Sequence, residues 1–535
     1  MNTNRTNKNI LEIIYKYIKL FSIISGFAAL AFVLYYIIFI SKGFYHSDCT
    51  DTILWAQAMI DSKTIMNPDF KYATLLPFGG QLIMFPFVAI FGYGVKAQII
   101  GMAIFAILFT LSIAYFCKSA NLNYKWCSLT VSFVLFILCS SEKLREIFWC
   151  HIIYYSLGAF FLLLGLGLVL TILKKEKLSI KHYILLFIWT TLCSTNGSQS
   201  FILYTLPVIA ALIAERFFDL DTPLFSKKNS RHGLIIINLS VSIIVGLILA
   251  NIVNHDITAG YQQLYSNFDK ITNWTQNILN LIPAILSLCG VDPSDTTGVF
   301  TPFGILLLIR IIGVAIIMIT PFIMLTMYKK IYNTAYRITL LTHMFLTAFI
   351  LLGWIFGKLN NANWRLSPLI ITSSILTIMF IKWILNQKKH ARLSALLIIP
   401  VLALLIIFTL DLFSTCLIKQ SKSNKKIEEI STYLQSEGLE YGYATFWNAN
   451  IIPLLTDSNI KVRSVDIIDN NIHATMYQSN VNWYNNNAYP EYFLLLSTDE
   501  YSLYIKSEKY KQPLEIKRYM DYIILIYDYN IMNSK

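Results

Sequence analysis

The sequence predicts a polytopic α-helical membrane protein of about eleven transmembrane helices, followed by a C-terminal α/β domain. Three observations support this fold class. The 535 residues are 56% hydrophobic and only 14% charged, whereas soluble domains are about a quarter charged. Apolar runs near the ~20 residues that cross a bilayer recur as far as Leu417. Beyond Ser421 the chain changes to short alternating segments rich in Tyr and Asn.

The apolar runs define the predicted spans. The first follows a polar stretch, Met1–Lys19, and it is too long for the apolar part of a cleavable signal. It also lacks a small-residue cleavage site, so we expect it to remain as a membrane helix. The predicted spans are Leu20–Ile40, Ala97–Cys117, Cys127–Ser141, Ile152–Leu173, Tyr183–Thr195, Phe201–Ala214, Leu234–Val253, Phe303–Met327, Ile338–Gly357, Pro368–Leu385 and Leu393–Leu417.

The distribution of Lys and Arg predicts the orientation of these spans. Basic residues concentrate in the N-terminal stretch and in every second loop, at residues 118–125, 174–181, 216–231, 329–337 and 388–392. Cytoplasmic loops carry such an excess, so we expect a multi-pass protein of the cell membrane with a cytoplasmic N-terminus. An odd number of spans then places the C-terminal domain outside. The same bias explains the net charge of +13 without a nucleic-acid partner.

The predicted boundary between the two domains follows the last span. We expect a membrane domain over residues 1–419 and an extracytoplasmic α/β domain over residues 420–535. The first outer loop, residues 41–96, contains an apolar segment, Gln81–Phe91, which we interpret as a helix in the membrane interface. If this segment were a span, every later loop would change sides and the charge bias would disappear.

The C-terminal segments alternate between two patterns. Apolar and aromatic runs predict strands, and amphipathic runs predict helices. The predicted strands are Tyr441–Trp447, Lys461–Ile468, Tyr492–Ser497 and Tyr522–Tyr527, and the predicted helices are Lys425–Glu437, Ala449–Leu455 and Asp499–Tyr510.

Two aspartates follow the first span on the predicted outer face. Asp48 and Asp51 would share one face of a helix that begins at Ser47. Two carboxylates near an apolar surface repel each other and lose solvation, so the pKa of one can rise into the range of a useful base. The pair could also hold Mg²⁺ or Mn²⁺, and no other cofactor is indicated. The structural alternative is helix capping, because Ser47 and Asp48 are common N-cap residues.

Two later outer segments contain further candidates. Residues 141–151 are dense in charge: Arg145 could bind a phosphate, and Glu146 and His151 suit acid, base or ligand roles. Ordinary helical ion pairs would explain the same residues. Between the ninth and tenth spans, Trp364 and Arg365 could hold the phosphate of a lipid head group, or simply anchor the helix at the interface.

These residues together resemble the GT-C class of membrane glycosyltransferases, which includes protein O-mannosyltransferases and the lipid A aminoarabinose transferase. Asp48 and Asp51 resemble the acidic motif that follows the first span in that class, although here they are three residues apart. The segment Pro77–Gly92 is similar to a Pro/Gly-led interfacial helix that ends in Phe-Gly. Asn363–Pro368 is similar to the Arg-containing start of a late span, and Lys71 is the nearest basic residue before Pro77.

The resemblance implies a glycosyltransferase that moves a hexosyl or pentosyl group from a polyprenyl-phosphate donor to an acceptor hydroxyl, with inversion. The acceptor would belong to a glycan, a lipid or a protein. Asp48 would act as the base, and Asp51 would support it or share a metal ion with it. The predicted phosphate-binding residues are Arg365, Arg145 and Lys71. The predicted acceptor-lining residues are His46, Glu146, His151, Trp447 and Asn448.

Three other functions fit parts of the sequence. A lipid-linked sugar transporter or flippase would need charged groups within the spans, and the sequence concentrates its charges outside them. An O-antigen-type ligase or polymerase would not be expected to carry an outer α/β domain. A non-catalytic membrane scaffold would leave Asp48 and Asp51 without a role.

Overall fold

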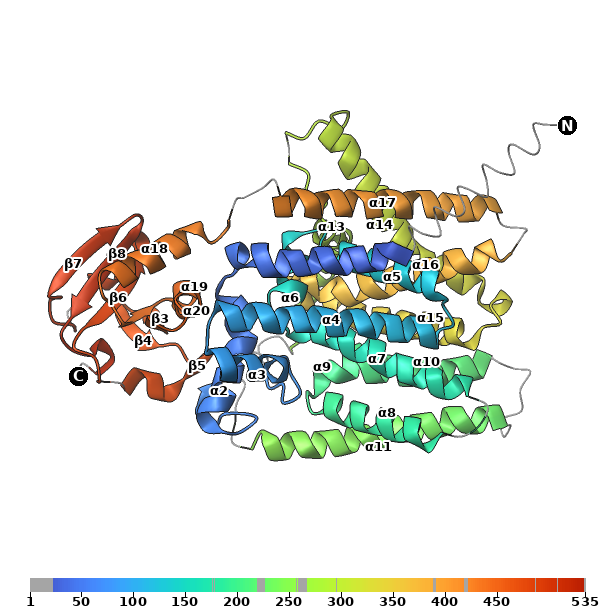
Figure 1. Cartoon of the computed structure of the whole chain (residues 1–535), viewed down its shortest axis with the longest axis horizontal. Helices are drawn as coiled ribbons and strands as arrows, with labels where there is room; N and C mark the ends of the chain where they lie inside the picture. Colours follow the sequence, from blue (N-terminus) through green and yellow to red (C-terminus); the bar gives the residue numbers. More distant parts are fainter. Residues whose placement is uncertain are drawn as a thin grey trace.

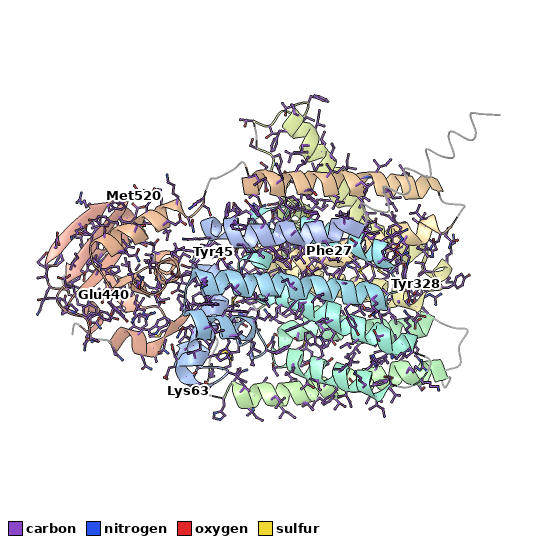
Figure 2. All side chains as sticks on the ribbon, in the orientation of Figure 1. Phe27, Tyr45, Lys63, Tyr328, Glu440 and Met520 are labelled. Carbon is purple, nitrogen blue, oxygen red and sulfur yellow. The ribbon has the colours of Figure 1, made fainter. Side chains whose placement is uncertain are left out.

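Long helices lie side by side in a bundle, and a sheet-containing domain covers one end of it (Figure 1). The computed structural model describes residues 23–175, 177, 179–218, 227–255, 257, 267–294, 296–387, 391–417, 422–485, 487–507 and 509–533. The end that carries the C-terminal domain, here the domain-bearing end, lies near Tyr45. The opposite end lies near Tyr328 (Figure 2).

The predicted membrane architecture is confirmed. Within the described parts of the chain, nine helices are long and apolar enough to cross a membrane. Two further predicted spans form the shorter apolar helices α5 (Tyr124–Ile137) and α8 (Ile180–Ser194). The first span covers Ile23–Phe44, and the polar stretch predicted before it lies outside the described residues. All predicted spans are therefore helical.

The remaining helices of the bundle agree with the predicted order. They are α2 (Asp51–Ser62), α3 (Gln81–Phe91), α4 (Val95–Ser119), α6 (Glu142–Trp149), α7 (Tyr154–Lys174), α9 (Ser198–Ser200), α10 (Leu206–Phe218), α11 (Lys227–Val253), α12 (Trp274–Leu279), α13 (Leu281–Leu288), α14 (Pro302–Thr326), α15 (Thr334–Ile355), α16 (Ser367–Leu385) and α17 (Ala391–Leu417). The segment predicted as an interfacial helix is α3, with the same bounds.

The predicted third span ends earlier than expected. Helix α5 stops at Ile137, and α6 departs from it at an angle of 114°. The cause is a cap: Ser141 precedes α6, and its side chain accepts from the backbone N–H of Leu144. The Ser141 hydroxyl also donates to the carbonyl of Leu288 at 2.8 Å. This turn places α6 across the domain-bearing end instead of along the bundle.

One ion pair lies within the predicted spans. Arg310 of α14 pairs with Asp411 of α17, and its Nη1 donates to the carbonyl of Gly290 at 2.7 Å. The charge-poor interpretation of the spans missed this pair, because it counted few charges and did not consider two of them meeting. Pairing and hydrogen bonding satisfy the Arg310 charge, which removes most of the cost of its burial.

The C-terminal domain is built on one mixed sheet with strand order β4-β3-β2-β6-β8-β7. Strands β2, β3 and β6 run parallel, and β4, β7 and β8 pair antiparallel with their neighbours. The strands are β2 (Tyr441–Ala444), β3 (Lys461–Ile468), β4 (Asn471–Ala474), β6 (Tyr492–Ser497), β7 (Glu515–Tyr519) and β8 (Tyr522–Tyr527). The helices are α18 (Lys425–Ser436), α19 (Phe446–Ala449), α20 (Ile451–Leu455) and α21 (Thr498–Tyr504).

Polar contacts attach this domain to the first outer loop. Strand β1 (Phe70–Lys71) of the loop pairs with β5 (Ser479–Asn480) of the domain. The Asp457 carboxylate accepts from the backbone N–H of Val95 at 3.1 Å. The Asn424 side-chain amide donates to the Lys42 carbonyl at 2.6 Å. Contacts from several parts of the domain therefore hold it against the loop that contains the acid pair.

Candidate active site

The acid pair lies in a turn between the first span and α2. Residues Ser47–Thr50 form a 3-10 turn, η3, and α2 begins at Asp51 without a side-chain N-cap bond. The Ser47 hydroxyl instead donates to the carbonyl oxygens of Phe446 and Trp447 in the C-terminal domain, at 2.7 and 3.0 Å. The capping alternative is therefore wrong, and the turn is tied to the domain above it.

Glu146 of α6 is the centre of a charged cluster beside this turn. Its Oε2 lies 3.4 Å from His46 Nε2 and 2.5 Å from Lys143 Nζ, and its Oε1 lies 3.9 Å from His151 Nε2. Burial raises the pKa of Glu146, but the hydrogen bond from His46 and the nearby positive charges lower it to about 2. The structure thus brings together three predicted site residues, which we call the Glu146 cluster with Lys143.

The two histidines of the cluster differ in charge. Burial lowers the pKa of His46, but Cys49 and Glu146 raise it, and the balance lies above its usual value. Burial lowers the pKa of His151 to about 4, although Glu146 opposes the shift. At neutral pH His46 is therefore a cation paired with Glu146, and His151 is neutral.

The two aspartates differ in solvent access. Asp48 is half-buried, whereas Asp51 is only 2% exposed. Burial raises the pKa of Asp48; the charge of His46 lowers it, Glu146 raises it again, and it stays above its usual value. Burial and then repulsion from Asp48 raise the pKa of Asp51 well above its usual value, with partial opposition from Gln478. Asp48 fits an accessible base, and Asp51 favours its protonated form.

The donor set does not fit the divalent-metal site suggested for the acid pair. In the part of the chain that the structure describes, no group of three or more His, Cys, Asp or Glu side chains is placed to hold a metal ion. Mg²⁺ and Mn²⁺ prefer ionised oxygen ligands, and the environment of Asp51 favours its neutral form.

Arg365 lies on a segment that contacts the Glu146 cluster. It belongs to η9 (Asn363–Leu366), which packs against α6. Lys143 Nζ lies 4.6 Å from the centre of the Trp364 ring, a cation–π contact that joins the two segments. Arg365 is half-buried, and its Nη1 donates to the Lys358 carbonyl at 2.7 Å. The structure therefore places Arg365 at the side of the cluster.

The other two predicted phosphate-binding residues lie elsewhere. Arg145 is buried; its Nη1 donates to the Cys139 carbonyl at 2.8 Å, and its guanidinium lies 5.8 Å from the centre of the Tyr36 ring. These contacts fit a packing role beneath α6. Lys71 lies in β1, and no contact printed for the described residues connects its side chain to the Glu146 cluster.

Trp447 and Asn448, the predicted acceptor-lining residues of the C-terminal domain, lie in α19. The Trp447 ring is 60% exposed, and its centre lies 6.1 Å from that of His46. Asn448 is nearly buried, and its Oδ1 accepts from the Tyr522 hydroxyl at 3.3 Å within the domain. Trp447 therefore borders the site, and Asn448 faces the domain interior.

Two glutamines that the sequence did not indicate hold the site together. Gln478 Oε1 accepts from Trp55 Nε1 at 2.6 Å, which links α2 to the C-terminal domain. Gln98 Nε2 donates to the carbonyls of Cys49 and Cys150, at 2.9 and 2.5 Å. Both glutamines are fully buried. A single amide in a polar loop or an apolar helix carries no sequence signal, because its role depends on partners far along the chain.

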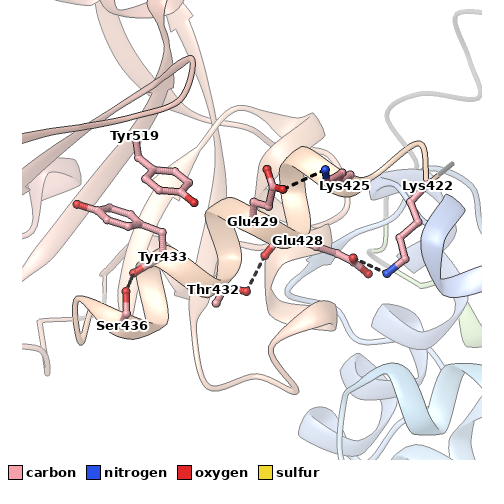
Figure 3. Close-up of a pocket in the computed structure, with 8 residues that line it drawn as sticks. All are labelled: Lys422, Lys425, Glu428, Glu429, Thr432, Tyr433, Ser436 and Tyr519. Atoms are coloured by element: carbon pink, nitrogen blue, oxygen red, sulfur yellow. Dashed lines mark hydrogen bonds and ion pairs between the residues drawn. The ribbon is translucent and has the colours of Figure 1, made fainter. Parts of the chain in front are cut away.

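A separate groove of about 840 Å³ runs along α18 in the C-terminal domain (Figure 3). Its charged residues pair with one another, Lys422 with Glu428 at 2.9 Å and Lys425 with Glu429 at 3.6 Å. The rings of Tyr433 and Tyr519 stack at 4.3 Å. None of the residues that line the groove belongs to the acid pair or to the Glu146 cluster, so we do not include it in the candidate site.

Comparisons with known proteins bear on the fold. No protein-family model and no curated protein matches the sequence. Two solved structures of ArnT from Cupriavidus metallidurans are similar in three dimensions, at 10% sequence identity over 94% of this chain and 97% of that chain. The TM-score is 0.55 for ArnT bound to undecaprenyl phosphate and 0.54 for the apo state.

A third structure, the Archaeoglobus fulgidus oligosaccharyltransferase in complex with Zn and sulfate, reaches a TM-score of 0.49. It is 14% identical over 82% of this chain and 62% of that chain. The sequence motifs predicted a GT-C membrane fold, and the likeness to ArnT, a GT-C protein, over nearly the whole chain confirms it. The chain has the GT-C fold.

Proposed function

We propose that this chain is a membrane glycosyltransferase that moves a sugar from a polyprenyl-phosphate donor to an acceptor hydroxyl. One observation carries the proposal. A half-buried Asp48 lies beside the Glu146 cluster, which contacts the segment of Arg365. The fold in which they meet is shared with ArnT, which was solved bound to undecaprenyl phosphate.

Asp48 acts as the base in this proposal. Its ionised carboxylate accepts the proton of the acceptor hydroxyl while the oxygen attacks the anomeric carbon, and the configuration inverts. Its raised pKa supports the role, because a base works best when its pKa approaches the operating pH. Asp51 remains neutral beneath Asp48, so the site avoids a second buried negative charge.

Arg365 stabilises the departing polyprenyl phosphate. Negative charge develops on the phosphate as the glycosidic bond breaks, and a fixed guanidinium lowers the energy of that transition state. The hydrogen bond to Lys358 holds the Arg365 side chain in place before the donor binds. Lys143 adds a second cation at the contact between α6 and η9.

The acceptor occupies the side of the site beneath the C-terminal domain. His46, Glu146 and His151 offer hydrogen-bonding groups there, and the exposed Trp447 ring offers a face for a sugar. The acceptor is a glycan, a lipid or a protein that carries a hydroxyl group. Asn448 and Arg145 support the surrounding structure in this proposal, through their contacts with Tyr522 and Cys139.

The reaction takes place on the outer face of the membrane, with the N-terminus in the cytoplasm and the C-terminal domain outside. Basic residues at the opposite end of the bundle support this orientation. They include Lys329 and Lys330 in η7 (Tyr328–Lys330), beside the Tyr328 position shown in Figure 2.

The proposal is tested with full-length protein in native membranes and a panel of radiolabelled polyprenyl-phosphate hexoses and pentoses. We expect transfer of one labelled sugar with equimolar release of polyprenyl phosphate, and no transfer from the nucleotide-linked form of that sugar. Arg365→Gln should lower kcat/KM by roughly 10²- to 10³-fold, the usual effect of losing one transition-state contact.

Lys270→Gln is the matched control, because Lys270 is an exposed cation in an outer loop. It should leave the rate within about twofold of wild type, as expected for a distant surface charge. Equal use of the nucleotide sugar, or an unchanged rate in Arg365→Gln, would contradict the proposal.

A further inference from the structure

A second polar cavity opens at the end of the bundle opposite the C-terminal domain. Its volume is about 670 Å³, and its walls come from the ends of α4 and α7, the start of α11 and the loop that leads into α15. No residue of the candidate active site lines it. A ligand held there would therefore be separate from the proposed sugar transfer.

The charged side chains that line this cavity are all basic. Lys174, Arg231 and His232 contribute to its wall, and none of the described residues that line it is acidic. Arg231 is fixed at the wall by donating to the backbone oxygen of Lys175. His232 is held from behind by Glu215, whose Oε2 lies 3.2 Å from His232 Nε2, and both side chains are almost fully buried.

A helix terminus adds to the positive potential of the cavity. Asn333 and Thr334, at the start of α15, are part of the lining. Asn333 is the N-cap of that helix, and its Oδ1 accepts from the backbone N–H of Ala335 at 2.9 Å. The N-terminal end of a helix carries a partial positive charge and binds anions. Three side chains and one helix end therefore favour an anion in the same space.

The apolar part of the wall indicates the form of that anion. Leu170 and Leu173, on the last turn of α7, line the cavity beside Lys174. An inorganic ion gains nothing from these leucines, whereas an acyl chain would bury them. Basic pockets between membrane helices on the cytoplasmic side typically hold phosphate head groups of anionic lipids.

We infer that this cavity binds the phosphate group of an anionic phospholipid. Lys174 and Arg231 pair with the phosphate, His232 and the α15 N-terminus donate to it, and Leu170 and Leu173 contact the first part of the acyl chains. Free phosphate has the same charged group, so the experiment must separate the two sources.

Binding is measured on the full-length protein by native mass spectrometry and by the shift of thermal unfolding. The probes are dioleoyl phosphatidylglycerol, dioleoyl phosphatidylcholine and inorganic phosphate. We expect at least one retained phosphatidylglycerol, weaker retention of phosphatidylcholine, and no shift with inorganic phosphate below millimolar concentration. Lys174→Gln should weaken phosphatidylglycerol binding about fivefold, the usual effect of one cation near a lipid phosphate.

Lys330→Gln is the matched control, because Lys330 is exposed at the same end but does not line the cavity. It should leave phosphatidylglycerol binding unchanged. Equal loss in both variants, or equal retention of both lipids, would show a general attraction of the basic end and overturn the inference. Saturable binding of inorganic phosphate alone, abolished by Lys174→Gln, would overturn the assignment to a lipid. Because Lys174 is exposed, its substitution should not impair folding.

Discussion

The two ends of the helix bundle handle charge in opposite ways. At the domain-bearing end, the carboxyl groups of Asp51 and Glu146 are held away from water between the membrane helices and the C-terminal domain. At the opposite end, cations surround a cavity that no acidic residue lines among those described. Burying a carboxyl group is costly unless it is paired or protonated. The first arrangement is therefore the one that packing alone explains least well.

Glu146→Ala should have the largest effect among the supporting residues of the domain-bearing end. It removes the carboxylate that positions His46, Lys143 and His151, so sugar transfer should fall roughly 10²-fold. The measurement is the initial rate with the labelled donor. Glu142→Ala, an exposed change in the first turn of the same helix, should leave the rate close to wild type. Similar losses in both variants would assign the effect to the helix instead of the cluster.

The pH dependence of transfer should show a smaller effect. Asp48 works as a base only when ionised, and burial raises its pKa, so the rate should fall on acidification at a pH above the ordinary aspartate pKa of about 3.9. The charge of Lys143 lowers the pKa of Asp48, so Lys143→Met should move this acid limb to higher pH. Lys330→Met, at the opposite end, should leave the limb in place. A limb that moves to lower pH in Lys143→Met would contradict the assignment.

Asp51→Asn should have the smallest effect at the domain-bearing end. The environment favours a protonated Asp51, and an amide has nearly the same shape and charge as a neutral carboxyl group. We expect the transfer rate to stay within about threefold of wild type, equivalent to less than ~1 kcal/mol. A loss as large as that of Glu146→Ala would mean that Asp51 is ionised in the working enzyme.

Much of the fold could be predicted because its signals are local. Each span is an apolar run that reports burial in a bilayer, and each predicted run is helical in the structure. Strands β3, β6 and β8 have the predicted bounds, because their apolar and aromatic residues alternate with turn residues. Strands β4 and β7 were missed, since they are short, exposed at the edges of the sheet and rich in polar residues.

The candidate site was only partly predictable because it depends on distant contacts. Asp48, Glu146 and Arg365 could be selected as unusual charges in outer loops, and the structure places the Arg365 segment against the Glu146 cluster. The roles of Arg145 and Gln478 depend on the Cys139 carbonyl and the Trp55 indole, and only the folded chain identifies these partners. A sequence shows which side chains can carry charge, and the fold decides which of them meet.

The most direct test of the proposed mechanism compares Asp48→Asn with Asp61→Asn in native membranes, using the labelled polyprenyl-phosphate donor. Asp61 is an exposed acid on α2 that hydrogen bonds to Gln57, so it controls for charge and loop position. Loss of a general base predicts a rate roughly 10²- to 10⁴-fold lower in Asp48→Asn, at unchanged expression and donor binding, and a normal rate in Asp61→Asn. A rate in Asp48→Asn within about threefold of wild type, a change of less than ~1 kcal/mol, would contradict the role of Asp48 as the base.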